Sequence, residues 1–273
     1  MKKENNVKSR NRIFELDILR GISIFLMILH HFIYDLRHVF GLDVFAFQDT
    51  RYFTSLIRGF FLCVFVIVSG ICCQFSRNNI KRAGKLTIAA IILSIGMAVA
   101  SKISGFDLYI FFNMLFVLAV SIFLEGLFDL FYRRQMTKIG NDPERQILFQ
   151  SRFYLFLLIF ALAGIGAEQL QFVFTEAEAY WLIPFGEGFI PDSVPGMGDY
   201  LPLFPWIGFF FIGVFIGRVY YKERKSIFPE IPPWLDKIFT PFSWIGRNSL
   251  WVYLFHQPVI LGILYLLQML GLL

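Results

Sequence analysis

Ionisable side chains lie inside an apolar stretch near the N-terminus, residues 13–38. The stretch is long enough for a first membrane span, yet it holds Glu15, Asp17, Arg20, His30, His31 and Asp35. An ionisable group at membrane depth costs roughly 2.5–3.5 kcal/mol on insertion scales, so several on one span need a chemical explanation. Four of them share one stripe of an α-helix: Asp17, Arg20, His31 and Asp35. Arg20 and His31 would be roughly 16 Å apart along the axis, so the stripe predicts one wall of a polar cavity.

His31 and Asp35 have the residue types and the spacing of a general-base pair. A carboxylate four residues after a histidine can hold the imidazole in one tautomer and stabilise its protonated form. Alternatively, His31 is an interfacial histidine near the outer headgroups, and spacing alone does not separate the two. His30 points about 100° away on the helix, so we expect it to pack or to lie at the interface.

Arg20 could do one of three things on this stripe. Its guanidinium can bind a phosphorylated ligand bidentately, pair with Asp17, or extend to lipid phosphate. The stripe that it shares with His31 favours the cavity, with Asp17 as its natural partner.

Two later stretches also carry polar groups at membrane depth. Ser69 is followed by the basic residues Arg77, Lys81, Arg82 and Lys85. Residue chemistry alone favours lipid headgroups as their ligand over the phosphates of a cytosolic nucleotide. His256 and Gln257 precede Pro258, which frees a carbonyl one turn earlier. These two side chains either line a polar cavity or stabilise a kinked helix.

The elements that must position these residues are membrane helices. The chain has 273 residues, of which 57% are hydrophobic and 16% charged, which excludes an ordinary soluble domain. Apolar runs long enough to cross a bilayer recur along it. We predict an all-α polytopic membrane bundle, with residues 1–12 as a basic tail and 13–273 as a single domain. About seven spans are expected, at 16–36, 53–74, 86–103, 107–129, 153–174, 202–220 and 248–271.

The distribution of charge predicts the orientation of the bundle. Most Lys and Arg residues fall in residues 1–12, 75–86, 132–152 and 218–247, whereas the alternate loops are mainly acidic. The positive-inside rule then places the N-terminus in the cytoplasm, and it explains the net charge of +5 without nucleic acid as a partner. The acidic outer loop 175–201 is either a lid over an acceptor or a simple cap. We expect 218–247 to be an interfacial connector anchored by Trp234 and Trp244.

The order of these motifs resembles the heparan-alpha-glucosaminide N-acetyltransferase catalytic-domain family, within the wider group of transmembrane acyltransferases that includes acyltransferase-3. The resemblance lies in four segments: R-x-x-x-L-D-x-L-R-G-I-x-I-x-x-M-x-x-x-H at Arg12–His31, F-x-x-V-S-G at Phe65–Gly70, P-L-F-P-W-I-G at 202–208, and W-I-G-R-N-S-L-W-V-Y-L-F-H-Q-P at Trp244–Pro258. The family's Gly-Ile-Leu-His-like segment has no histidine at the corresponding residues 112–116. Any role of that histidine therefore does not transfer.

The resemblance implies acyl transfer from cytosolic acetyl-CoA or another acyl-CoA to an amine or hydroxyl of a sugar or glycan across the membrane. His31 matches the catalytic histidine of the wider group, and we expect Asp35 to orient it. Either His31 deprotonates the acceptor, or it forms an acyl-imidazole first. The expected donor-binding residues are Asp17, Arg20, Ser69, Arg77, Lys81 and Arg82. The expected acceptor-binding residues are His256 and Gln257.

Two other classes of protein also fit intramembrane polar residues. A secondary transporter or proton-coupled carrier uses such residues for relays, but no second half of the sequence repeats the pattern. A scaffold with a structural polar network would not explain the long outer loop. We expect no metal, a lipid bilayer as a partner and the plasma membrane of a bacterium as the location. A homodimer is compatible with the sequence.

Overall fold

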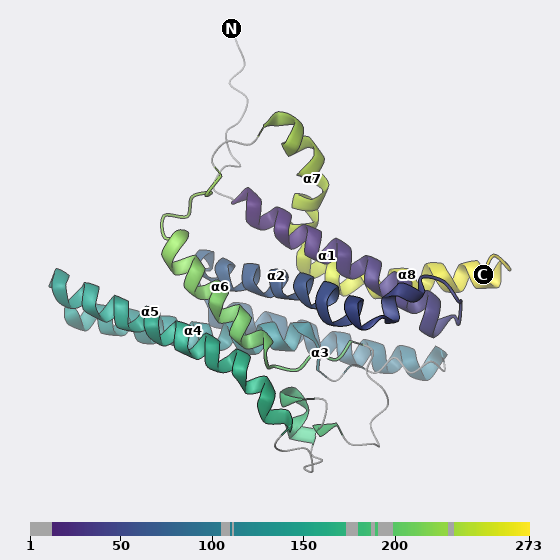
Figure 1. Ribbon diagram of the computed structural model, residues 1–273, viewed down its shortest axis with the longest axis horizontal. Helices are drawn as coiled ribbons and strands as arrows, with labels where there is room; N and C mark the ends of the chain where they lie inside the picture. Colours follow the sequence, from purple (N-terminus) through teal and green to yellow (C-terminus); the bar gives the residue numbers. More distant parts are fainter. Residues whose placement is uncertain are drawn as a thin grey trace, which may run out of the picture. The chain divides into compact units, whose positions relative to one another are not determined.

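The computed structural model describes residues 13–104, 110, 112–172, 180–186, 189–190, 199–228 and 232–273 (Figure 1). The regular structure of this part is helical: α1 Phe14–Tyr34, α2 Arg58–Ile71, α3 Asn79–Ser104, α4 Met114–Ile139, α5 Pro143–Gly166, α6 Trp206–Tyr220, α7 Pro233–Arg247 and α8 Ser249–Met269. The expected all-α membrane architecture is confirmed. The basic tail 1–12 and most of the acidic loop 175–201 lie outside the described residues.

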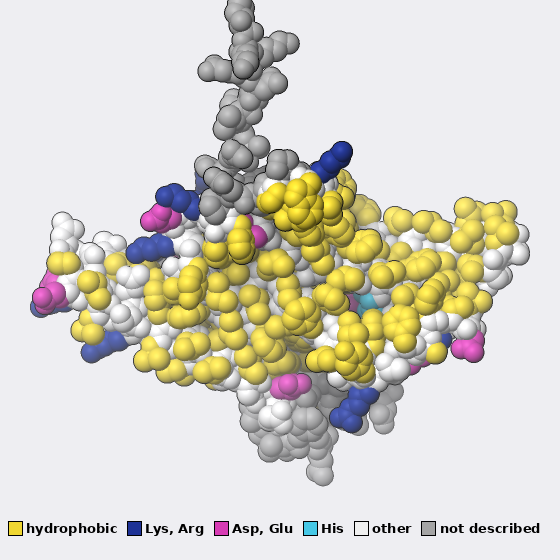
Figure 2. Space-filling model, turned by 45° about the horizontal axis from the view of Figure 1, so that its top comes forward, with side chains coloured by type: hydrophobic (Ala, Val, Ile, Leu, Met, Phe, Trp, Pro, Cys, Tyr) yellow, Lys and Arg dark blue, Asp and Glu magenta, His cyan; other side chains and the backbone are white. Residues whose placement is uncertain are grey.

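Six helical stretches are long and apolar enough to cross a bilayer: Phe14–Val39, Phe53–Phe75, Asn79–Ile103, Met114–Ile139, Pro143–Gln169 and Ser249–Met269. The predicted span 202–220 corresponds to α6, which has 15 residues. A helix of that length extends about 22 Å, less than the roughly 30 Å of a hydrocarbon core. Large apolar side chains are exposed along the long helices, and Figure 2 shows them over most of the visible helix surface. Exposed apolar area of this extent identifies lipid as the surrounding medium.

Two boundaries were predicted wrongly around the basic residues 132–152. This segment is not a loop, because α4 continues to Ile139 and α5 already begins at Pro143. Gly140, with φ 68°, ends α4, and the Asp142 side chain accepts a hydrogen bond from the Arg145 amide at the start of α5. The end of α4 and the start of α5 are polar, so hydropathy alone does not distinguish them from a loop.

The chain forms two compact units, Met1–Phe65 with Gly217–Leu273 and Val66–Ile216. That residues 13–273 act as one domain stays a prediction. In the first unit, α1 and α7 touch backbone to backbone. An ideal Cβ on Gly21 would lie 1.8 Å from the Phe242 carbonyl oxygen, and one on Gly246 would lie 1.9 Å from the Asp17 carbonyl oxygen. Only glycine permits this approach, and it fixes α7 against the first half of α1.

The other half of α1 packs against α8. Leu36 is buried with Ile260 and Leu264 of α8, and partly buried apolar side chains of residues 28–42 surround them. Because α8 follows α7 after Asn248, α1 is held at one end by α7 and at the other by α8. The connector 218–247 contains the helix α7, on which Trp234 and Trp244 are both exposed, as an interfacial helix requires.

In the second unit, small residues let three helices approach closely. A Cβ on Gly213 of α6 would lie 2.0 Å from the Ile67 carbonyl oxygen, and one on Gly70 would lie 2.1 Å from that of Phe210. A Cβ on Gly208 would lie 2.5 Å from the Ala161 carbonyl oxygen of α5. Small residues allow helices to approach this closely in a membrane, and Gly70 likewise meets a helix backbone.

Candidate active site

Arg20 lies on α1 with part of its guanidinium buried. Its Nε and Nη2 atoms are buried and have no hydrogen-bond acceptor among the described residues. A guanidinium carries five N–H donors and stays charged, so burying it without acceptors costs free energy that an anionic group would recover. Arg20 and His31 are eleven positions apart on α1, roughly 16 Å along the axis.

His31 lies beside His256 of α8. Their ring centroids are 5.0 Å apart, with the planes tilted by 54°. The Nδ1 atom of His256 lies 2.6 Å from the Tyr253 carbonyl oxygen. Because a carbonyl can only accept, the proton of a neutral His256 is on Nδ1, and Nε2 carries the lone pair. His256 thus makes a hydrogen bond within α8, as expected if it stabilises a kinked helix. Its ring also lies beside that of His31, the predicted catalytic histidine.

Asp35 directly follows the last residue of α1, and its partner comes from α8. The Gln257 amide nitrogen donates to both carboxylate oxygens, at 2.9 and 3.0 Å, and Asp35 is 1% exposed. The backbone changes here from α-helix to a π-helical turn, Asp35–Val39, a feature frequent at functional sites. The structure therefore joins a predicted catalytic residue to a predicted acceptor-binding residue. That Asp35 orients His31 stays a prediction.

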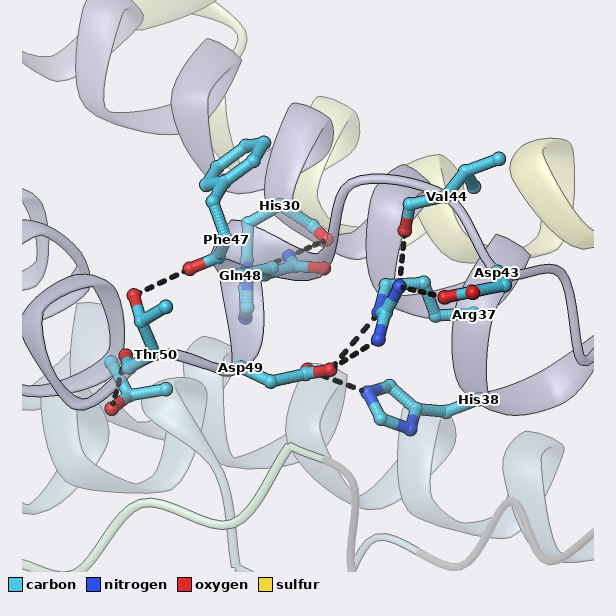
Figure 3. A network of polar contacts seen from close by, with 10 residues as sticks. His30, Arg37, His38, Asp43, Val44, Phe47, Gln48, Asp49 and Thr50 are labelled. Atoms are coloured by element: carbon cyan, nitrogen blue, oxygen red, sulfur yellow. Dashed lines mark hydrogen bonds and ion pairs between the residues drawn. The ribbon is translucent and has the colours of Figure 1, made fainter.

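The loop after α1 is fastened by Arg37, as Figure 3 shows. We call residues 41–50 the cap loop. Arg37 Nη2 lies 2.5 Å from Asp49 Oδ2, and Nη1 lies 2.5 Å from the Val44 carbonyl oxygen. His38 Nε2 lies 3.1 Å from Asp49 Oδ1. The hydrogen bond from Arg37 holds the pKa of the Asp49 carboxyl below its ordinary value.

The remaining predicted donor-binding residues lie elsewhere in the chain. Asp17 is on α1 at the crossing with α7, where its carbonyl oxygen faces Gly246. The others belong to the second unit: Ser69, Arg77, Lys81 and Arg82. Ser69 is buried on α2, and its carbonyl oxygen lies 3.7 Å from the Cys73 sulfur. Arg77 and Lys81 are exposed near the start of α3, where they remain accessible to an anion.

Two acidic residues for which the sequence suggested no role have clear partners. Glu15 accepts hydrogen bonds from the Ser226 hydroxyl at 2.6 Å and the Ile227 amide at 2.9 Å, which ties the start of α1 to the segment after α6. Glu125, buried on α4, accepts from the Asn79 amide, which also donates to the Cys73 carbonyl oxygen at 3.3 Å. An acid within an apolar span is a signal that could have identified Glu125. Nothing local in the sequence links Glu15 to its partners.

No group of three or more His, Cys, Asp and Glu side chains in the described part of the chain could hold a metal ion, and the expectation of no metal stays a prediction.

Comparison with known families gives one result. The family model described as "Heparan-alpha-glucosaminide N-acetyltransferase, catalytic" matches residues 12–141 and 145–258, nearly the whole chain. No curated protein and no solved structure matches. The match begins just before α1, ends within α8, and includes the Arg20, His31 and His256 positions. The chain belongs to the heparan-alpha-glucosaminide N-acetyltransferase catalytic family.

Proposed function

We propose that the protein transfers an acetyl or other acyl group from cytosolic acyl-CoA to an amine or hydroxyl of a sugar across the membrane. The family supports a membrane acetyltransferase role, and the donor, the acceptor and the direction of transfer are our proposal. One observation carries it: on α1, the guanidinium of Arg20 has two buried nitrogens without an acceptor among the described residues, and roughly 16 Å further along the helix His31 lies beside His256 of α8. A bacterial plasma membrane as the location belongs to the same proposal.

The donor end of the site is Arg20. Its buried Nε–H and Nη2–H groups fit the oxygens of a phosphate, which a guanidinium binds bidentately. In the predicted orientation this end of α1 is cytoplasmic, the side from which acyl-CoA arrives. The extended pantetheine arm of CoA has a length comparable to the separation of Arg20 from His31. Arg77, Lys81 and Arg82 belong to the second unit, and a role for them in binding acyl-CoA stays a prediction.

The chemistry belongs to the histidine end. The acceptor nitrogen or oxygen attacks the thioester carbonyl carbon, the bond from that carbon to sulfur breaks, and CoA leaves as a thiolate. His31 takes the proton that the acceptor loses and passes it to the thiolate. In the two-step alternative, a ring nitrogen of His31 attacks the thioester first and the acceptor then takes the acyl group. Trapping an acyl-enzyme in the absence of acceptor distinguishes the two routes.

Gln257 and His256 of α8 suit the acceptor. The Gln257 amide nitrogen is engaged by Asp35, whereas its Oε1 atom is buried and has no hydrogen-bond donor among the described residues. That oxygen can accept a hydrogen bond from the amine or hydroxyl of a sugar. The tautomer of His256 leaves Nε2 able to accept as well. An acceptor held by these groups would lie beside His31.

The test is an assay of detergent-purified protein with acetyl-CoA and a panel of amino sugars, following CoA release. We expect His31→Ala to lower turnover by roughly 10²–10⁴-fold, the usual contribution of a general base, without loss of folding. We expect Arg20→Gln to raise the KM for acetyl-CoA. The control is His38→Gln, because this exposed histidine is outside the pair and Arg37 still holds Asp49. Full turnover by folded His31→Ala, or solute counter-flow without acetyl-CoA binding, would refute the proposal.

A further inference from the structure

Gln48 is a buried glutamine in the largely exposed cap loop. It lies on the short 3₁₀ helix Ala46–Asp49 of the cap loop, and it is 2% exposed. Its amide nitrogen donates to the His30 carbonyl oxygen at 2.7 Å and also contacts Nδ1 of the His30 ring (Figure 3). Both hydrogens of the amide are therefore directed to one residue of α1. The contact joins the cap loop to the residue beside His31.

The two contacts together determine the protonation of the His30 ring. A backbone carbonyl can only accept, so the atom of Gln48 that faces it must be the amide nitrogen. The same nitrogen faces Nδ1, which must then accept as well, and the proton of His30 is on Nε2. A doubly protonated His30 would present an N–H to this N–H donor. Gln48 therefore favours one neutral tautomer of His30.

His30 touches the predicted catalytic histidine. The ring centroids of His30 and His31 are 5.5 Å apart, and His31 in turn lies 5.0 Å from His256. When His31 takes a proton, a second charge on His30 would repel it strongly, because this part of the molecule has a low dielectric constant. If His30 stays neutral, no second positive charge opposes the protonation of His31. The Nε2–H group of His30 then also points in one fixed direction.

Stability alone does not explain a glutamine at this position. Gln48 Oε1 is buried and has no hydrogen-bond donor among the described residues, which costs folding free energy. The loop also holds Phe45 in the left-handed region, at φ 53°, which a residue with a side chain rarely adopts. Methionine has nearly the same length and shape and would bury no unsatisfied carbonyl. Such costs in folding free energy are found mainly at functional sites.

We propose that Gln48 is a positioning residue of the histidine site, which holds His30 neutral with its proton on Nε2 so that His31 alone receives the proton of the acceptor. The inference rests on the proposed function. The cap loop positions Gln48, and the hydrogen bonds from Arg37 to Val44 and Asp49 hold this loop in place.

The experiment compares Gln48→Met with Asp43→Asn in the full-length protein in detergent. Asp43 is on the same loop, and its exposed side chain forms a 3.5 Å ion pair with Arg37. Three quantities are measured: CoA release from acetyl-CoA with glucosamine as acceptor, the Tm, and the tautomers of ¹⁵N-labelled histidine side chains by NMR. The chain has 4 histidines, so the His30 signals can be assigned by their loss in His30→Gln.

In the unmodified protein we expect His30 as the Nε2–H tautomer. We expect Gln48→Met to give a mixture of tautomers and a kcat lower by roughly 10- to 100-fold, the size typical of a small misplacement. We expect an unchanged Tm, because the loss of the two contacts to His30 is offset by removal of the buried Oε1 atom that has no donor among the described residues. Asp43→Asn should change none of the three. A proton on Nδ1 of His30 in the unmodified protein would overturn the inference. So would a Gln48→Met protein whose kcat is normal, or whose kcat and Tm fall together. If no form of the protein releases CoA from acetyl-CoA, the proposed function fails, and the tautomer measurement still decides the role of Gln48.

Discussion

The contact between α1 and α7 can be broken by a single methyl group. An alanine Cβ at Gly21 would lie 1.8 Å from the Phe242 carbonyl oxygen and 2.6 Å from its carbonyl carbon. Ordinary van der Waals contact begins near 3.4 Å, so α7 would have to move by about 1.6 Å. The atoms in the way are backbone atoms, which cannot rotate aside as a side chain can. The movement must therefore displace the whole helix.

The expected cost of Gly21→Ala is near the upper end of the usual range for overpacking, roughly 3 kcal/mol. Alanine recovers up to about 1 kcal/mol through its higher helix propensity, which leaves a net loss of about 2 kcal/mol. For a chain of this size, 1 kcal/mol corresponds to roughly 2–4 °C, so we expect the Tm to fall by about 4–8 °C. Because α7 leads through Asn248 into α8, the shift also separates His256 from His31, and acyl transfer should fall with stability.

The matched control is Gly262→Ala on α8, where an added Cβ meets no atom within 4 Å. Thermal unfolding in detergent, followed by tryptophan fluorescence, gives the Tm of each variant. Gly262→Ala should leave the Tm unchanged or raise it slightly. Gly246→Ala disturbs the same contact between α1 and α7 from the α7 side. The fall in Tm of the double variant should therefore be smaller than the sum of the two single falls. Equal Tm values for Gly21→Ala and Gly262→Ala would refute the reasoning.

Two further predictions concern the cap loop and the second unit. The hydrogen bond from Arg37 holds the pKa of the Asp49 carboxyl below its ordinary value, so the charged Asp49 stabilises the cap loop above that ordinary value and stops doing so as the pH falls through the lowered pKa. Hydrogen exchange of the cap loop, corrected for the intrinsic rate, should be equal at pH 7 and 5 and become faster as the pH falls through the lowered pKa of Asp49. Loss of protection between pH 7 and 5 would show that another group holds the loop. Asn79→Ala should destabilise by roughly 1–3 kcal/mol, because it removes an amide donor from the buried Glu125 carboxyl, and an unchanged Tm would contradict this.

The helices and the stripe on α1 were predictable because both follow from local periodicity. Apolar runs identify membrane helices, and a 3.6-residue repeat places Arg20 and His31 on one face. The partners of these residues were not predictable in the same way. The pairing of Asp35 with Gln257 joins residues 222 positions apart. It occurs at a π-helical turn, which no residue type in the sequence predicts. Gln48 had no signal either, since a polar side chain in a loop is ordinarily solvated.

The contact between Asp35 and Gln257 also determines when the site can form during synthesis. At roughly 5–20 residues per second, the 222 residues between them take about 10–45 s to emerge. For that time α1 is in or near the bilayer with Asp35 and His31 not yet covered by α8. A nascent chain in this state exposes polar groups that membrane chaperones and proteases recognise. Chains that lose α8 through premature termination should therefore be degraded rather than accumulate as a partly active enzyme.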